Sequence, residues 1–281
     1  MKTEEGYTMA SPENSARDSS EKRIEFHKYD VSFYPEIAFG GIPRSDGVIE
    51  FYSRLNSMIT AYSVVVDFGC GRGSHTEDPV EFRRDLRRLK GKAAKVIGLD
   101  VDAAASSNPT IDEFHSLTPG QRWPIQSESI DLVVCDCVLE HLPDPGYLFR
   151  EANRVLVHGG FLCIVTTNLL SYVGLAAKLI PNRLHSAVLS RTQLSREEKD
   201  VFPTLYRCNT VFALRREMER HGFGAAVFGH DGGPGYLRFS KIAYAMGFLH
   251  QTFSPSFIRP TLMAFGRKLQ QPFVTAEPHE G

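Results

Sequence analysis

Short hydrophobic runs alternate with amphipathic segments along most of the chain. Four runs are continuous and rich in Val, Ile and Leu, which is typical of strands buried on both faces of a parallel sheet. They lie at 64–67, 95–100, 130–136 and 161–167. Weaker strands are predicted at 111–117, 224–231 and 261–268. Helical spacing predicts helices after the N-cap Asp46, after Asn209, and over 79–89, 145–156, 169–180 and 237–249.

The alternation of strands and helices predicts an α/β fold with a doubly wound, mostly parallel sheet. We expect one domain over 24–268, between a disordered N-terminal tail (1–23) and a C-terminal tail (269–281). Two insertions, at about 169–200 and 232–258, are expected to form a helical cap. Gly159 and Gly160 are expected to end the helix that precedes the strand at 161–167.

The composition changes this picture little. The chain has 281 residues, of which 42% are hydrophobic and 23% charged, as in an ordinary globular protein. Its 32 Lys and Arg against 33 Asp and Glu lack the positive field of sequence-blind nucleic-acid binding, so no nucleic-acid partner is expected. The basic segment 83–95 leaves an RNA-binding patch as an alternative. Helical spacing, with Leu86 and Leu89 turned inward, instead favours a solvated helix face.

The cysteines and the N-terminus favour a cytoplasmic protein. Five cysteines are an odd number with neither disulfide nor zinc spacing, which favours a reducing compartment. Cys135 and Cys137 are interpreted as core residues, because alternate positions of a strand point to the same face. The first residues lack the apolar segment of a secretory signal.

The sharpest chemical signal is a glycine-rich turn directly after the strand at 64–67. Asp67 is followed by Gly69, Gly71 and Gly73 in the sequence DFGCGRG. Glycines let the chain turn tightly and let backbone N–H groups approach a ligand at the carboxyl edge of a parallel sheet. We therefore expect an open nucleotide-type pocket there.

The spacing of the glycines bears on which ligand enters that pocket. G-x-G-x-G differs from the G-x-G-x-x-G of dinucleotide folds, so an NAD-dependent oxidoreductase is the weaker alternative. The carboxylate of Asp67 suits a ligand with an ammonium group and no phosphate. Asp100, at the end of the next strand, can accept both hydroxyls of a ribose. Adenosine joined to an amino acid, without phosphate, describes S-adenosylmethionine.

Three blocks of sequence together resemble the class I S-adenosylmethionine-dependent methyltransferases, in particular the type-11 branch that includes ubiquinone and menaquinone methyltransferases. They are VVVDFGCGRG, VIGLDVD, and the long block from WPIQSESIDLVVCD to GGFLCIVTT. The resemblance spans about 64–168, with weaker support near 261–268. It implies a Rossmann-like fold with a seven-stranded sheet and S-adenosylmethionine as cofactor.

The resemblance also implies which residues bind that cofactor. Asp67, Gly69 and Gly71 would line its methionine part, and Asp100 would hold the ribose. Asp136 and Cys137 would flank the methionine and the reacting centre. The full set of expected cofactor-binding residues is Asp67, Gly69, Cys70, Gly71, Asp100, Val101, Asp136 and Cys137.

Two departures from the family pattern limit this correspondence. The stretch TPGQRWPI lacks the acidic residue that contacts adenine in relatives, and the segment between Gly73 and Asp100 is longer than usual, which predicts an insertion. Some quinone O-methyltransferases hold a metal with acidic and histidine residues near 137–141. Because Cys137 replaces the first of those acids, no metal is expected.

His141, in VLEHLPDP, is the candidate catalytic residue. A histidine titrates near neutral pH and can remove a proton from the nucleophile as a general base. The alternative, which we favour, is that Glu140 and His141 orient the loop that carries them.

The predicted function is transfer of a methyl group to oxygen, nitrogen or carbon of a small molecule, with a hydrophobic acceptor among the candidates. A scaffold that binds S-adenosylmethionine without catalysis is a further alternative. The apolar segments 169–180 and 237–249 are interpreted as a lid over the acceptor, with core packing or peripheral membrane contact as alternatives. Residues named for these roles are Tyr172, His185, Tyr206 and His230 for the acceptor, and Arg183, Arg238 and Lys241 for lipid head groups.

Overall fold

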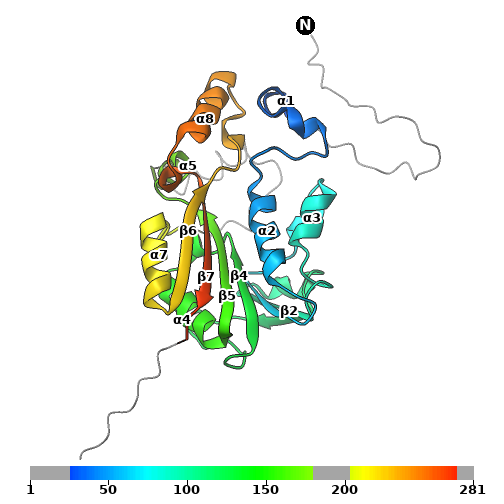
Figure 1. Cartoon of the computed structure of the whole chain (residues 1–281), viewed down its shortest axis with the longest axis vertical. Helices are drawn as coiled ribbons and strands as arrows, with labels where there is room; N and C mark the ends of the chain where they lie inside the picture. Colours follow the sequence, from blue (N-terminus) through cyan, green and yellow to red (C-terminus); the bar gives the residue numbers. More distant parts are fainter. Residues whose placement is uncertain (1–25, 180–202, 271–281) are drawn as a thin grey trace, which may run out of the picture.

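The computed structural model describes residues 26–179 and 203–270, and its centre is a seven-stranded sheet (Figure 1). Six strands run in one direction, and β7 runs antiparallel to both of its neighbours. In sheet order the strands are β3 (Glu113–Ser116), β2 (Lys95–Asp100), β1 (Val64–Phe68), β4 (Ile130–Asp136), β5 (Leu156–Thr167), β7 (Thr261–Lys268) and β6 (Phe223–His230). This confirms the predicted doubly wound, mostly parallel sheet.

The helices cover both faces of the sheet. The α-helices are α1 (Lys28–Phe33), α2 (Gly47–Met58), α3 (Glu81–Arg87), α4 (Pro145–Val155), α5 (Tyr172–Leu179), α7 (Val211–Arg220) and α8 (Lys241–Phe253). Short 3-10 helices are η1 (Pro35–Ala38), η2 (Ser74–Glu77), η3 (Ala103–Ser107), η4 (Leu139–His141), η6 (Gly235–Leu237) and η7 (Ser256–Ile258). Within the described residues, none of the helices has the length and apolar character needed to cross a membrane.

Two hydrophobic cores lie on opposite faces of the sheet because neighbouring strand residues point in opposite directions. Val65 of β1 packs in the core that α2 covers, and Val66 packs in the core that α4 and α7 cover. This double burial explains why the strands are hydrophobic without alternation. It also holds the carboxyl ends of β1, β2 and β4 at one edge of a rigid layer.

Several predicted boundaries are corrected by local structure. Helix α3 is shorter than predicted and ends at Arg87, so that Leu89 can enter the core. Helix α8 begins about one turn later than predicted, at Lys241, after the side chain of Ser240 caps it. Helix α5 likewise starts at Tyr172 rather than at Leu169.

Gly159 and Gly160 do not end a helix. Helix α4 ends at Val155 and β5 starts at the next residue, so both glycines lie within the strand. Gly159 has a φ of +81°, and the pairing of β5 with β4 shifts register near Ile130. The glycines therefore permit an irregular start to β5 rather than a helix stop.

Helices α1, α5 and α8 lie beyond the carboxyl ends of the parallel strands (Figure 1). There α1 and α8 share a small third cluster of buried side chains, which includes Tyr34 and Tyr244. The predicted N-terminal tail (1–23) and residues 271–281 of the predicted C-terminal tail lie outside the described residues, as does the segment 180–202, which includes residues 180–200 of the predicted cap. His185 and Arg183 belong to that last segment, so their predicted roles are not addressed by the structure.

Candidate functional site

The glycine turn leaves β1 with a left-handed backbone that a side chain would disturb. Gly69 and Gly71 have φ values of +74° and +53°. A Cβ at Gly69 would lie 2.3 Å from a methyl group of Val138, so this position has no room for a side chain. A Cβ at Gly71 would meet nothing within 4 Å, which leaves the backbone of the turn open on that side.

Asp100 lies directly against this turn. One carboxylate oxygen accepts a hydrogen bond from the Gly71 N–H at 2.9 Å, and the other accepts from the Asp102 N–H at 2.9 Å. Each oxygen keeps a second lone pair for a ligand hydroxyl. The glycine turn after β1 therefore contacts Asp100 at the end of β2, which brings the two predicted acidic residues, Asp67 and Asp100, to the same edge of the sheet.

Two of the expected cofactor residues differ in what they present to this edge. Cys70 is buried, and its thiol faces Gly98 of β2, so only its backbone is available to a ligand. Burial raises the pKa of this thiol well above its ordinary value. Val101 is half exposed and follows Asp100 at the rim.

Asp136, at the end of β4, is held by two side chains that the sequence analysis did not single out. The Tyr52 hydroxyl of α2 donates to Asp136 Oδ2 at 2.8 Å, and Arg87 Nη2 of α3 donates to the same oxygen at 2.9 Å. The guanidinium carbon of Arg87 also lies 5.5 Å from the centre of the Tyr52 ring. Arg87 Nε is buried and has no hydrogen-bond partner.

The same cluster controls the charge of Asp67. Burial, and after it the negative charge of Asp136, raise the pKa of Asp67 to about 7, while Arg87 acts in the opposite direction. Burial also raises the pKa of Tyr52 well above its ordinary value, so Tyr52 acts as a neutral hydroxyl donor. Asp67, Asp100 and Asp136 therefore face a common edge, with the cation of Arg87 beside them.

The basic segment 83–95 is not only a solvated face. Leu89 is buried, as predicted, but Arg83 pairs with Asp46 and Asp78, and Arg87 reaches into the site. The predicted insertion between β1 and β2 supplies this arginine. The contact between Arg87 and Asp136 joins residues 49 positions apart, and no local pattern marks such a pair.

The structure corrects the prediction that Cys135 and Cys137 are both core residues. Strand β4 ends at Asp136, and Cys137 adopts a φ of +58°. The left-handed residue breaks the alternation of the strand, so Cys135 is buried and Cys137 is exposed. Cys137 therefore lies at the rim of the site.

His141 and Glu140 make contacts with the chain near 203–206. Nδ1 of His141 lies 3.0 Å from the Pro203 carbonyl oxygen, and the Glu140 carbonyl accepts from the Leu205 N–H at 2.7 Å. The buried Glu140 carboxylate accepts a hydrogen bond from the Thr166 hydroxyl at 2.6 Å. These contacts match the loop-orienting role, and the base role of His141 stays a prediction.

Candidate residues in the cap region are scattered. The ring of Tyr172 packs edge-on against His250, while His230 lies near the start of α2. Tyr206 has a φ of +50° in the segment that Glu140 holds. These three side chains contact different parts of the chain.

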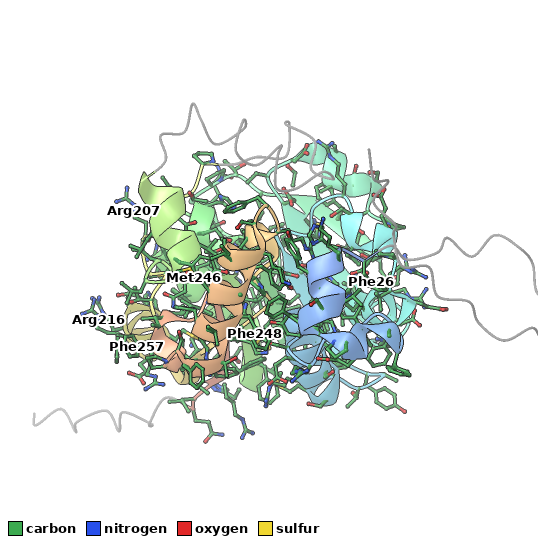
Figure 2. The ribbon with its side chains drawn as sticks, turned by 90° about the horizontal axis from the view of Figure 1, so that it is seen from above. Phe26, Arg207, Arg216, Met246, Phe248 and Phe257 are labelled. Carbon is green, nitrogen blue, oxygen red and sulfur yellow. The ribbon has the colours of Figure 1, made fainter. Side chains whose placement is uncertain are left out.

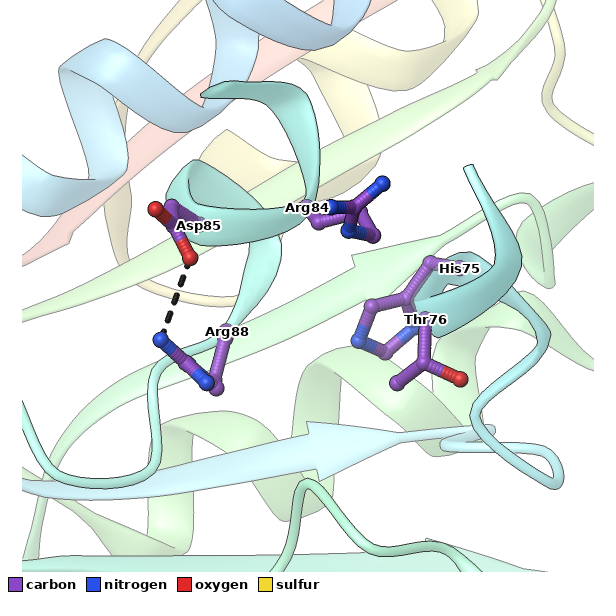
Figure 3. A pocket seen from close by; sticks show the side chains of 5 residues that line it. All are labelled: His75, Thr76, Arg84, Asp85 and Arg88. Carbon is purple, nitrogen blue, oxygen red and sulfur yellow. Dashed lines mark hydrogen bonds and ion pairs between the residues drawn. The ribbon is translucent and has the colours of Figure 1, made fainter. Parts of the chain in front are cut away.

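A small open pocket of about 140 Å³ lies between η2 and α3 (Figure 3). Its lining includes an ion pair of Arg88 with Asp85, with N and O atoms 3.0 Å apart. Burial lowers the pKa of His75, on the opposite side of the pocket in η2, to about 4. None of the predicted site residues lines this pocket. The residues that line it are His75, Thr76, Arg84, Asp85 and Arg88.

Residues 66–164 match the family model described as a methyltransferase domain. About a third of the chain therefore resembles a methyltransferase domain. The matched segment runs from β1 into β5 and includes the glycine turn, Asp100 and Asp136.

Similar curated proteins match part of the chain. A protein of Mycolicibacterium smegmatis named "Probable S-adenosylmethionine-dependent methyltransferase" is 32% identical over 38% of this chain and 39% of its own length. A ubiquinone biosynthesis O-methyltransferase of Aliivibrio fischeri is 30% identical over 43% of this chain and 54% of its own length. The chain thus spans 39% to 54% of the length of these relatives.

Solved structures with a similar arrangement include the YcgJ protein of Bacillus subtilis, with 15% identity and a TM-score of 0.47 over 79% of this chain and 99% of that one. Another is a geranyl diphosphate C-methyltransferase of Streptomyces coelicolor, with 14% identity and a TM-score of 0.47 over 78% of this chain and 74% of that one. The doubly wound fold follows from the strand order of this chain, independently of these similarities.

Proposed function

We propose that this protein transfers the methyl group of S-adenosylmethionine to a small molecule. The observation that carries the proposal is the convergence of Asp67, Asp100 and Asp136 at the carboxyl edge of β1, β2 and β4. An excess of carboxylates favours a ligand with sulfonium and ammonium charges and disfavours the phosphates of a dinucleotide. The match to a methyltransferase domain supports the same cofactor.

The residues present fit this cofactor. The open side of Gly71 leaves room for a ligand beside the backbone of the turn, and Asp100 is held there with a lone pair available on each oxygen. We infer that Asp100 binds the ribose hydroxyls and that Asp67 lies nearest to the ammonium group. Arg87, whose Nε has no partner, is the candidate anchor for the carboxylate of the methionine part.

The chain's own contribution to the reaction is chiefly orientation. When bound, the cofactor supplies an electrophilic methyl group on a sulfonium sulfur. A displacement at that carbon requires the nucleophile to lie in line, and holding it there removes much of the barrier. Asp136 and the rim residue Cys137 lie at the end of β4, where they can border the acceptor.

The acceptor is proposed to be a small and hydrophobic molecule. The relatives named for ubiquinone biosynthesis support O-methylation of such a compound. Leu170 and Leu175, near and within α5, are exposed beyond the carboxyl edge and could contact it. His141 is the candidate base for a hydroxyl acceptor, although its contact with Pro203 favours the loop-orienting role.

Calorimetric titration of the full chain tests the cofactor. We expect binding of S-adenosylhomocysteine and no binding of NADH, and the reverse result would overturn the proposal. Incubation with a metabolite extract and S-adenosylmethionine labelled on its methyl group then tests turnover. Binding without transfer of label to any compound would favour the non-catalytic scaffold instead.

A further inference from the structure

Helix α8 carries a stripe of large apolar side chains in contact with solvent. Positions spaced by three and four residues share one face of a helix, so Ile242, Met246, Leu249 and Phe253 project together, and Phe239 is exposed just before the N-cap Ser240. Monomeric proteins seldom expose such a contiguous patch without an interaction to explain it. The stripe and the exposed fraction of each side chain are Phe239 75%, Ile242 76%, Met246 66%, Leu249 54% and Phe253 79%.

The opposite face of α8 is already used for folding. Tyr244 is buried and its ring lies 5.2 Å from that of Phe33 in α1, measured between centroids. The centroid of the Phe248 ring lies 5.3 Å from that of Phe33, and Gln251 accepts a hydrogen bond from the Tyr34 hydroxyl at 2.7 Å. Figure 2 shows α8 and α1 side by side, with Phe248 between them and Met246 turned away from α1. Stability of the α1–α8 contact therefore does not explain the stripe.

The net charge around the stripe is positive. Residues 232–276 contain no Asp or Glu, and residues 26–44 and 231–260 together have a net charge of +2. The three acidic residues of these two segments are each paired with an arginine. They are Asp30 with Arg238, Glu36 with Arg44, and Asp231 with Arg259. Lys241, at the start of α8, is exposed beside the stripe.

We propose that the stripe on α8 docks this protein on the surface of an anionic lipid bilayer. A helix of this kind lies in the interface with its apolar face among the acyl chains and its basic residues near the head groups. A bilayer accepts a single projecting helix without a matching groove, whereas a protein partner would have to present one. Phe239 and Phe253, at the two ends, would enter together. The membrane would then lie on the side of the molecule beyond the carboxyl edge.

This inference goes beyond the proposed methyl transfer and does not depend on it. Because the face lies on the same side as the proposed cofactor site (Figure 1), docking would also let a hydrophobic acceptor reach the site without crossing water. Titration with S-adenosylhomocysteine is done on the same samples. Failure of that titration would count against the proposed function and leave the result with lipids intact.

The test is co-sedimentation of the full chain with vesicles of phosphatidylcholine alone and of phosphatidylcholine mixed with phosphatidylglycerol. We expect binding that is stronger to the anionic vesicles. The double variant Ile242→Ser/Phe253→Ser should bind at least about tenfold more weakly, because two apolar side chains no longer leave water. Lys241→Glu should weaken binding to the anionic vesicles severalfold and leave binding to the neutral vesicles unchanged.

Phe212→Ser is the matched control. Phe212 is 69% exposed on α7 and lies outside the stripe, so its loss should not change vesicle binding. The proposal is overturned if the wild-type chain does not sediment with either vesicle, or if the double variant binds as well as the wild type. A dimer in light scattering that the double variant dissociates would show that the stripe joins two copies instead, which also overturns it.

Discussion

Arg87 offers the sharpest test of the proposed site, because the next residue in the chain provides a control for it. Arg87 contacts Asp136, while Arg88, the next residue, is exposed and pairs with Asp85 at the surface. If Arg87 binds the carboxylate of the methionine part, Arg87→Met should weaken binding of S-adenosylhomocysteine. Arg88→Met removes the same charge just after the end of α3 and should leave this binding unchanged.

The expected size follows from the loss of one charge-assisted hydrogen-bonding group, which is worth about 1.5–3 kcal/mol. The side chain of Arg87 is 26% exposed, so solvent screening places the effect toward the lower end of that range. Each 1.4 kcal/mol is about tenfold in affinity. We therefore expect the dissociation constant to rise by about ten- to thirtyfold.

A second ligand separates loss of this contact from general damage to the site. 5′-Methylthioadenosine has the adenosine and thioether parts but no amino-acid part, so its affinity should not change in Arg87→Met. Both ligands are measured by isothermal titration calorimetry on wild-type protein and the two variants. Equal weakening of both ligands, or none, would refute the assignment of Arg87 to the carboxylate.

Three further predictions concern the carboxylates and His141. Burial and Asp136 raise the pKa of Asp67 to about 7, so the folded protein retains a proton that the unfolded chain releases near pH 4. Ionisation of Asp67 therefore lowers the stability of the folded protein as the pH rises from about 4 to 7. Asp67→Asn should raise the melting temperature at pH 8 more than at pH 5, and it should weaken binding of S-adenosylhomocysteine. An equal shift in melting temperature at both pH values would contradict this prediction. Asp100→Ala should weaken the same binding by about 1–3 kcal/mol in calorimetry, and unchanged affinity would remove the ribose role. His141→Ala should leave cofactor binding intact, and a normal single-turnover rate with an identified hydroxyl acceptor would exclude the role of general base.

The strands and the first two carboxylates could be predicted because the signals are local. Double burial makes β1, β2 and β4 continuously hydrophobic, and the carboxyl ends of adjacent parallel strands must meet at one edge. Asp67 and Asp100 therefore belong together from sequence alone. Asp46 could likewise be recognised as the N-cap of α2, where its carboxylate accepts from the Val48 N–H at 3.0 Å.

The missed features depend on contacts between distant segments. Tyr52 and Arg87 looked like an ordinary helical residue and one of many surface arginines, and only the packing of α2 and α3 brings them to Asp136. The exposure of Cys137 depends on one left-handed residue just past the end of β4, which hydrophobic alternation does not reveal. The start of α8 differs by about one turn because Ser240 caps it, although the apolar pattern already begins at Leu237.

The placement of Asp67 is difficult to explain as a device for folding. Burial of a carboxylate beside a second one costs free energy, and this cost is visible in the raised pKa of Asp67. Arg87 offsets part of it, although Arg87 already shares its charge with Asp136 and leaves its own Nε without a partner. A ligand with an ammonium group and a carboxylate would remove both of these costs. Its ammonium group would stabilise ionised Asp67, and its carboxylate would accept a hydrogen bond from Arg87. We therefore interpret the strained electrostatics of this edge as preparation for a ligand that carries both charges, as an amino acid does.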